Sequence, residues 1–226
     1  QHPALSIEQS RLVTNSMAQR AAGNLLDAMA LRTNYSEKAL QNVVETESLI
    51  DRYEDKLGTY LMKITSRSLS DAQSEEVSKF LHTISDFERI SDHALNISQT
   101  AKEIHDKEVE FSAAALHELD VMESALREIL EVSIEAFVSN DIQKAARVEP
   151  LEEIIDGLCD EMKSLHVVRL QSGVCTLGQG FVFNDLLTNY ERVADHCSNI
   201  AVAMIELESD SFDTHEYLNS VKAMKS

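Results

Sequence analysis

Apolar side chains recur every three or four residues along most of the chain, which is the spacing of one face of an α-helix. Alternating β-branched residues are scarce, and only 6 Gly and 2 Pro interrupt the pattern. The pattern predicts an all-α protein with six long helices. These helices cover about residues 6–32, 36–66, 71–107, 112–138, 142–171 and 181–204. Pro150, inside the fifth segment, predicts a kink or a later helix start.

The second half of the chain repeats motifs of the first half. DFERISDHALNI at residues 86–97 returns as NYERVADHCSNI at residues 189–200, a displacement of 191 − 88 = 103 positions. The motif VxxxExxID, which begins at Val43, returns at Val148, 105 positions later. Internal repeats are strong evidence of architecture. The sequence therefore predicts a tandem pair of three-helix bundles, with residues 1–108 as the first repeat, 109–208 as the second and 209–226 as a polar C-terminal tail.

Carboxylates stack along the helices of both repeats, because residues four positions apart lie on one helix face. The stacked pairs are Glu47 with Asp51, Glu88 with Asp92, Glu152 with Asp156 and Glu191 with Asp195, and Asp55 and Asp160 extend two of them. Like charges at this spacing destabilise a helix by about 0.2–0.5 kcal/mol per pair. If the second and third helices of each repeat pack side by side, the carboxylates converge and a bound cation neutralises them. The alternative is a pair of acidic helix faces in contact with solvent.

Oxygen donors of this kind favour magnesium, manganese, calcium or ferric iron over copper, and they also accept zinc. The sequence thus predicts metal ions, as single ions or multinuclear clusters of iron, manganese, magnesium or zinc. Candidate supporting residues beside the carboxylates are Arg89, Asn96, Arg192, Asn199, His93 and His196. The arginines can orient ligands or form ion pairs. The histidines are either ligands or packing and hydrogen-bonding residues.

Charge and cysteine content narrow the classes of partner. The 20 Lys and Arg against 39 Asp and Glu give a formal net charge of −19, which excludes nucleic acid as a partner and disfavours anionic membranes. No apolar run reaches the roughly 18 residues that span a bilayer, so we expect no bilayer insertion within this chain.

The 3 Cys lack CxxC spacing, which predicts that they are reduced and serve as packing residues. We expect His166 and Arg169 at the surface, near a helix end.

The two three-helix repeats, their ExxxD motifs and the third-helix signature ERxxDHxxNI resemble the PhoU family over about residues 12–204. The resemblance implies a cytoplasmic, all-helical, non-catalytic regulator that binds metal clusters and restrains phosphate uptake when phosphate is plentiful. It implies one ligand set of Glu47, Asp51, Glu88 and Asp92, another of Glu152, Asp156, Glu191 and Asp195, and Asp55 and Asp160 as additional ligands. The implied partners are a membrane phosphate transporter, in cis or in trans, and a second copy of the chain.

Two branches of this family fit the sequence. Residues 165–201, with RLxxGxC before the last helix, look more like the cytoplasmic domain of bacterial sodium/phosphate cotransporters, and the QHPALS opening without an initiator Met agrees. We therefore expect such a domain at the inner face of the cell membrane. The alternative is a free-standing negative regulator of a phosphate ABC transporter and its sensor kinase.

Two other classes of function are less favoured. A carboxylate-bridged metalloenzyme is disfavoured because di-iron bundles usually supply Glu-x-x-His, and none of the 8 His follows Glu or Asp by three residues. A structural spacer with solvated acidic faces is the third class. It requires that the carboxylates of different helices lie apart.

Overall fold

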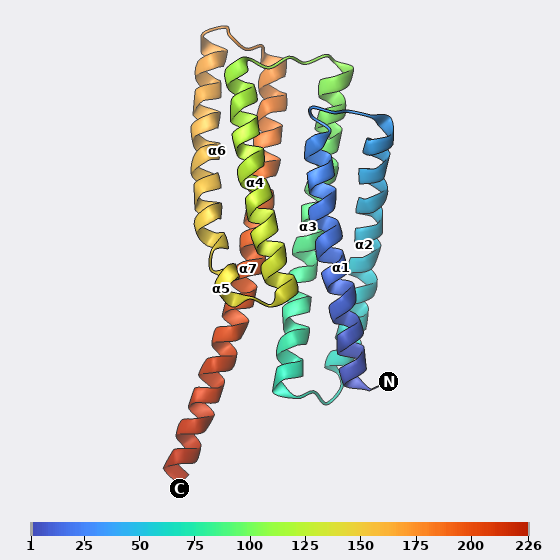
Figure 1. Ribbon diagram of the computed structural model, residues 1–226, viewed down its shortest axis with the longest axis vertical. Coiled ribbons are helices and arrows are strands. Elements are labelled where there is room, and N and C mark those ends of the chain that lie inside the picture. The colour runs from blue at the N-terminus through green and yellow to red at the C-terminus, as the bar shows by residue number, and fades with distance from the viewer. Residues whose placement is uncertain (1, 226) are drawn as a thin grey trace.

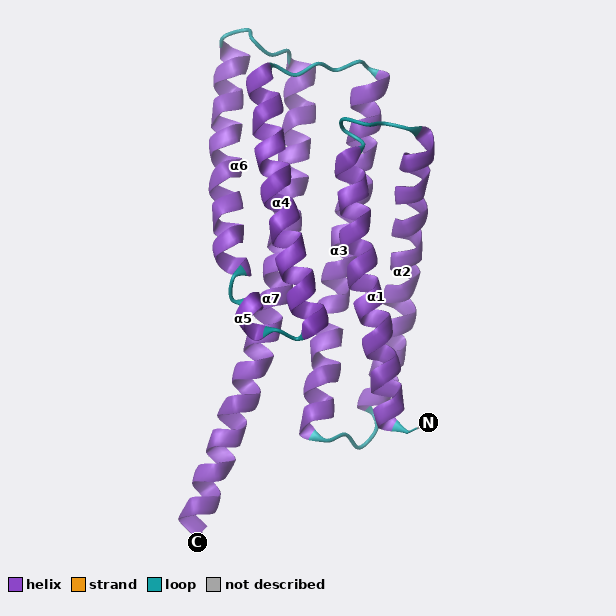
Figure 2. Ribbon diagram, in the orientation of Figure 1, coloured by secondary structure: helices purple, strands orange, loops and turns teal. Residues whose placement is uncertain are grey.

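The computed structural model describes residues 2–225, with side chains for residues 2–209 and 221–224. Every regular element in this part of the chain is an α-helix (Figure 2). The helices are α1 (Pro3–Ala30), α2 (Glu37–Thr65), α3 (Asp71–Asp106), α4 (Ala113–Ser139), α5 (Ile142–Ala145), α6 (Val148–Gln171) and α7 (Leu177–Lys225). The predicted all-α fold is confirmed, and six of these helices correspond to the six expected segments.

Short polar side chains determine where the long helices begin. Ser36, Ser70 and Ser112 each accept a hydrogen bond from a backbone N–H of the following helix, which satisfies a donor that the first turn leaves free. At the start of α7 the bonding is reciprocal: the Gln179 N–H donates to the Thr176 hydroxyl, and the Thr176 N–H donates to the Gln179 side-chain oxygen. The glycine-rich stretch expected as a loop to residue 180 is therefore already helical from Leu177.

The segment around Pro150 confirms the expected late helix start. Asp141 caps the single turn of α5 by accepting a hydrogen bond from the Lys144 N–H at 3.0 Å. The chain then restarts at Val148, which places Pro150 in the first turn of α6. Proline is tolerated there because the first-turn N–H groups have no partner within the helix.

The two repeats form neighbouring three-helix bundles that run in opposite directions (Figure 1). The first bundle is α1 to α3, and its α2–α3 loop lies at the lower end in this view. The second is α4, α6 and α7, and its α6–α7 loop lies at the upper end. Helix α3 packs against α7 and α1 packs against α4, so these contacts form the seam between the repeats.

The last helix extends beyond the body of the molecule. The backbone of residues 209–225, expected as a tail, continues α7 and projects from the second bundle (Figure 1). None of the described helices combines the length and the apolar character needed to cross a membrane.

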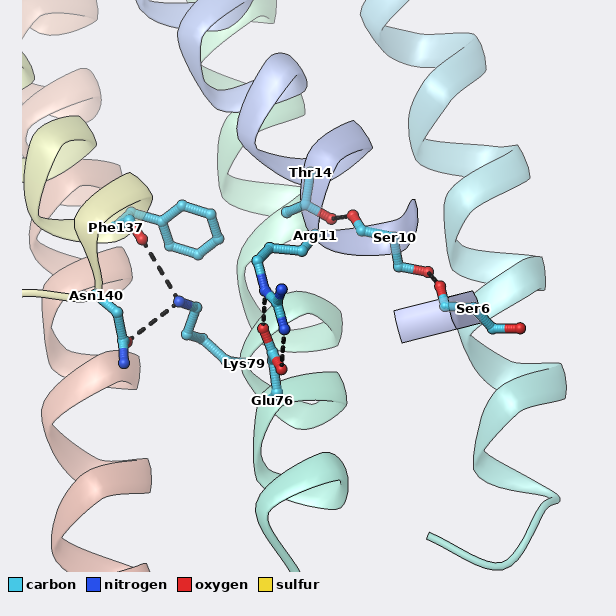
Figure 3. Close-up of polar contacts among 8 residues, drawn as sticks. All are labelled: Ser6, Ser10, Arg11, Thr14, Glu76, Lys79, Phe137 and Asn140. Carbon is cyan, nitrogen blue, oxygen red and sulfur yellow. Dashed lines mark hydrogen bonds and ion pairs between the residues drawn. The ribbon is translucent and has the colours of Figure 1, made fainter. Parts of the chain in front are cut away.

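The core follows the helical period, although not every apolar residue of α1 is inside. Met17, Leu25 and Met29 are buried, whereas Leu12 is 65% and Leu26 39% exposed. Near the start of α1 the buried face also carries small polar residues. The Ser10 hydroxyl donates to the Ser6 carbonyl and the Thr14 hydroxyl to the Ser10 carbonyl, each one turn earlier (Figure 3).

Polar contacts tie the two repeats together toward the lower end of the seam. The Lys79 Nζ on α3 donates to the carbonyl of Phe137 at 3.4 Å and to the Asn140 Oδ1 at 3.2 Å (Figure 3). Asn140 ends α4 in the left-handed conformation, with φ of 52°. A cation that binds the last carbonyls of a helix also favours the negative end of its dipole. Lys79 therefore stabilises the end of α4 from the neighbouring repeat.

A buried ion pair ties the repeats at the upper end. The Arg32 guanidinium, whose side chain is 4% exposed, donates to Glu123 on α4 at 2.7 and 3.0 Å. The Tyr190 hydroxyl on α7 donates to the same carboxylate at 2.7 Å. Removing one member of such a pair leaves an uncompensated buried charge.

Replacing Glu123 by Ala should therefore lower the free energy of unfolding by about 3–5 kcal/mol, since the buried Arg32 keeps only the exposed Asp120 as an acidic partner and the Tyr190 hydroxyl loses its acceptor. Denaturant unfolding measures this loss. Glu131→Ala, an exposed position on the same helix, should change stability by less than about 0.5 kcal/mol and serves as the control. Equal effects of the two substitutions would contradict a structural role for the pair.

Candidate metal centre

The first repeat brings carboxylates from two helices together. Glu47 on α2 and Glu88 and Asp92 on α3 each place one carboxylate oxygen within 4.8 Å of the other two. The i, i+4 spacing aligns Glu88 and Asp92 on one face of α3, and that face packs against α2. The expected convergence of acidic side chains is therefore present in this repeat.

A second group of oxygens adjoins the first. Asp51, Glu54 and Glu88 also have oxygens within 4.8 Å of one another, so Glu88 belongs to both groups. Glu54 is not among the predicted ligands, whereas its neighbour Asp55, which is predicted, is exposed and lies in neither group. The physical reason is helical rotation: a residue seven positions after Glu47 returns to within about 20° of its direction, whereas one eight positions on is about 80° away. The heptad spacing of Glu47 and Glu54 was the available signal.

The second repeat forms one such group. Glu152 and Asp156 on α6 and Asp195 on α7 have oxygens within 4.8 Å of one another. Glu191 lies beside Asp156 without joining the group, and its carboxylate adds to burial in raising the pKa of Asp156. Asp160 is exposed and outside the group, for the same rotational reason as Asp55.

The two repeats differ where Glu54 lies in the first. With the displacement of 105 residues, Glu54 corresponds to Cys159 and Gly58 corresponds to Lys163. The Lys163 Nζ lies 3.9 Å from a Glu191 oxygen, and burial, followed by Glu191, raises the pKa of the Cys159 thiol to about 12. A neutral thiol thus replaces one carboxylate of the second oxygen group, and an ammonium group lies beside the equivalent of another.

Crowding changes the protonation of the glutamates. Burial and, to a smaller extent, the neighbouring Asp92 carboxyl raise the pKa of Glu47 to about 7. The same two causes raise the pKa of Glu88 to about 8. Burial, followed by Asp195, raises the pKa of Glu152 to about 7. Like charges held close together disfavour the ionised form. Each group therefore takes up positive charge, as protons or as a cation.

The donor set fits a hard metal ion. Every member of the three groups is a carboxylate, and oxygen ligands suit magnesium, calcium, manganese and iron. Three carboxylates within ligand reach, with a fourth beside them, also provide the negative charge that a divalent cation needs. Glu47, Glu88 and Asp92 would hold an ion in the first repeat, and Asp51 and Glu54 would hold a second one next to it.

The histidine and asparagine candidates lie elsewhere, which corrects their expected place beside the carboxylates. His93 and His196 face each other across the seam with ring centroids 5.5 Å apart. The His93 Nδ1 lies 2.9 Å from the Asn189 Oδ1, and the His196 Nδ1 lies 3.1 Å from the Asp86 Oδ1. Each histidine follows its aspartate by one residue and is thus rotated about 100° away from the carboxylate face.

The two asparagines join the same seam. The Asn96 amide donates to the Asn189 Oδ1 at 3.3 Å, and the Asn199 amide donates to the Asp86 Oδ1 at 3.4 Å. Asp86 and Asn189 are equivalent positions of the two repeats, so the four bonds form a near-symmetric set. These residues hold α3 against α7.

The two arginine candidates are exposed on the same helices. Arg89 is close enough to Glu54 to lower the pKa of that carboxyl, although burial and nearby aspartates raise it overall. Arg192 lies near His93, where its charge adds to burial in lowering the pKa of the imidazole.

In metal-free protein, Glu47, Glu88 and Glu152 keep protons in the folded state at pH values where the unfolded chain has released them. Stability attributable to these groups is therefore present below about pH 4.5 and is lost as the pH rises through about 7 to 8. Melting temperatures in chelator, compared between the wild type and an Asp92→Asn, Asp195→Asn double variant, isolate this slope from other titrating groups. The wild type should lose stability more steeply across this window. Parallel curves would contradict the prediction.

Comparisons with known proteins match both repeats. A family model described as the PhoU domain matches residues 14–101 and 119–204. The chain is 23% identical to phosphate-specific transport system accessory protein PhoU homolog 1 of Thermotoga maritima, over 88% of this chain and 85% of that protein. It is 25% identical to the PhoU homolog of Borreliella burgdorferi, over 76% of this chain and 78% of that protein.

Solved structures agree on the fold. PhoU from Pseudomonas aeruginosa has a TM-score of 0.85 at 19% identity, over 92% of this chain and 100% of that one. The regulatory protein PhoU from Streptococcus pneumoniae has a TM-score of 0.81 at 15% identity, over 92% and 98%. Most of each relative's own length is matched, and the curated relatives are named as accessory proteins of phosphate-specific transport, whereas residues 165–201 suggested a cotransporter domain. With its family model covering both repeats, the chain belongs to the PhoU family.

Proposed function

We propose that this chain is a PhoU-type accessory protein. It acts on a membrane phosphate transporter and its sensor kinase and thereby restrains phosphate uptake. The observation that carries the proposal is the family match over both repeats. The named relatives are accessory proteins of the phosphate-specific transport system. The protein acts at the inner face of the cell membrane and regulates transport without catalysing a reaction.

Metal ions bound at the carboxylate groups are part of this proposal. We place two ions in the first repeat, because Glu88 belongs to two oxygen groups there. We place one ion in the second repeat, at the group of Glu152, Asp156 and Asp195. Bound cations invert the local charge of a domain whose formal net charge is −19. The loaded sites would therefore offer cationic surfaces to phosphate or to an acidic group of the partner.

Metal content tests the sites directly. Elemental analysis and calorimetric titration with manganese should show more bound metal in the first repeat than in the second. Asp92→Ala should remove one of the two ions of the first repeat, Glu54→Gln the other and Glu88→Ala both, whereas Asp195→Ala should remove the ion of the second repeat. Asp55→Ala is the matched control, because this neighbour of Glu54 lies outside the oxygen groups. Equal loss of metal in Glu54→Gln and Asp55→Ala would count against the assignment.

Uptake of labelled phosphate tests the regulatory role. Cells that lack the protein should keep taking up phosphate in excess medium, because the transporter is no longer restrained. The wild type and Asp55→Ala should restore restraint. An Asp92→Ala, Asp195→Ala double variant should fail to restore it if the metal sites form the regulatory surface. Unchanged uptake in the deletion strain would refute the regulatory function.

The cotransporter domain is kept as a second candidate because of the RLxxGxC segment at residues 169–175. The two candidates differ in what drives the regulated uptake, which is a sodium gradient in the cotransporter and ATP hydrolysis in the ABC transporter. Uptake that responds to this protein and requires sodium would favour the cotransporter. A response that disappears when the phosphate ABC transporter is deleted would favour the accessory protein.

A further inference from the structure

A small pocket lies beside the α6–α7 loop, far along α6 from the carboxylate group. It is lined by His166 and Arg169 of α6, by Cys175 of the loop and by Phe183 of α7. Its volume is about 10 Å³, which is the room of about one water-sized atom. Whatever this pocket receives is therefore no larger than one or two atoms.

Polar groups of this pocket are buried without partners. His166, expected at the surface, is 6% exposed, and neither of its ring nitrogens has a hydrogen-bond partner among the residues that the structure describes. Arg169 donates through its two terminal nitrogens to Glu118 at 2.7 and 2.9 Å, but its buried Nε has no partner. Leaving a buried donor unsatisfied costs about 1–3 kcal/mol. Such groups in a native protein need an explanation.

The first repeat shows that the fold does not require them. The residues at the positions of His166, Arg169 and Gly180 are Leu61, Ile64 and Val77 in the first repeat, and all three are buried core residues there.

Gly180 leaves room for the His166 imidazole. A Cβ at this position would lie 2.7 Å from the His166 Nε2, and the ring packs against Phe183 with centroids 4.9 Å apart. A histidine and the glycine that makes room for it thus replace a leucine and a valine. The second repeat has exchanged an apolar core contact for a polar pocket.

Cys175 supplies the reactive atom of the pocket. Its thiol is partly exposed and donates to the Thr176 carbonyl at 3.2 Å, whereas Cys159 and Cys197 are fully buried. Burial raises the pKa of Cys175, and the Arg169 charge opposes that effect. Reaction at this sulfur is therefore slow at neutral pH and becomes faster as the pH rises.

We propose that Cys175 is a site of reversible oxidation by hydrogen peroxide, and that this pocket holds the oxygen of the resulting sulfenate. The Cys175 thiolate attacks one peroxide oxygen, the S–O bond forms as the O–O bond breaks, and the sulfenic acid that results gives its proton to the departing hydroxide, leaving sulfenate and water. The sulfur loses two electrons and the peroxide gains them. The single oxygen added to sulfur matches the space in the pocket, and the Nε–H of Arg169 and a ring N–H of His166 are available to donate to it.

The test uses the full chain, with chelator and without it, so that oxidation promoted by metal at the carboxylate groups is recognised separately. Reduced protein receives hydrogen peroxide and then dimedone, which labels sulfenic acids, and peptide mass spectrometry locates the label. We expect label at Cys175 in both conditions, and none at Cys159 or Cys197 while the protein is folded. Cys175→Ser should remove the label.

Two variants separate a built pocket from an ordinary exposed thiol. The His166→Leu, Gly180→Val double variant restores the residues of the first repeat, and His166→Gln changes the ring alone in case the double variant does not fold. The sulfenate should decay about tenfold faster in either variant, because a hydrogen bond to a charged group contributes at least that factor. Oxidation should raise the melting temperature of the wild type and lower that of the variants.

Three outcomes would overturn the proposal. They are equal sulfenate lifetimes in the wild type and His166→Gln, equal labelling of all three cysteines in folded protein, and labelling blocked by a zinc ion that needs both His166 and Cys175. The carboxylate groups are unchanged in these variants, so failure here leaves the proposed phosphate regulation intact.

Discussion

Carboxylates from two adjacent helices lie within 4.8 Å of one another in each repeat, and the rest of the molecule must accommodate their repulsion. The helices cannot separate to relieve it, because their opposite faces form the core of each bundle. The charge must therefore be reduced in place. The raised pKa values of Glu47, Glu88 and Glu152 show how protons do so, and the all-oxygen donor set shows how a hard cation would.

The duplicated bundle provides its own comparison. Where the two repeats agree, as at Asp92 and Asp195, the shared geometry explains the side chain. Where they differ, the difference needs a local reason. Cys159 and Lys163 replace an acidic residue and a glycine next to the carboxylate groups, and His166 replaces a leucine near the α6–α7 loop. Compared with the first repeat, the second thus has less negative charge around its carboxylates and more polar side chains near the α6–α7 loop.

Helical periodicity and the internal repeat predicted the number of long helices, their approximate ends and the convergence of the acidic faces. Sequence alone did not predict the rotation of each side chain about its helix, so Asp55 was chosen in place of Glu54. The partners of His93 and His196 were also out of reach, because they come from the other repeat, about 100 residues away. The seam depends on how the bundles pack, which no local pattern contains.

Glu88 takes part in both oxygen groups of the first repeat, so the two groups are not independent. Any positive charge that settles on Glu88 alters the electric field at its neighbour, and by reciprocity the neighbour's occupant alters the affinity at Glu88. The second repeat has one group and lacks this coupling among its described residues. In the first repeat, uptake of protons or of a cation by one oxygen group is therefore coupled to uptake by the other. The single group of the second repeat takes them up without such coupling.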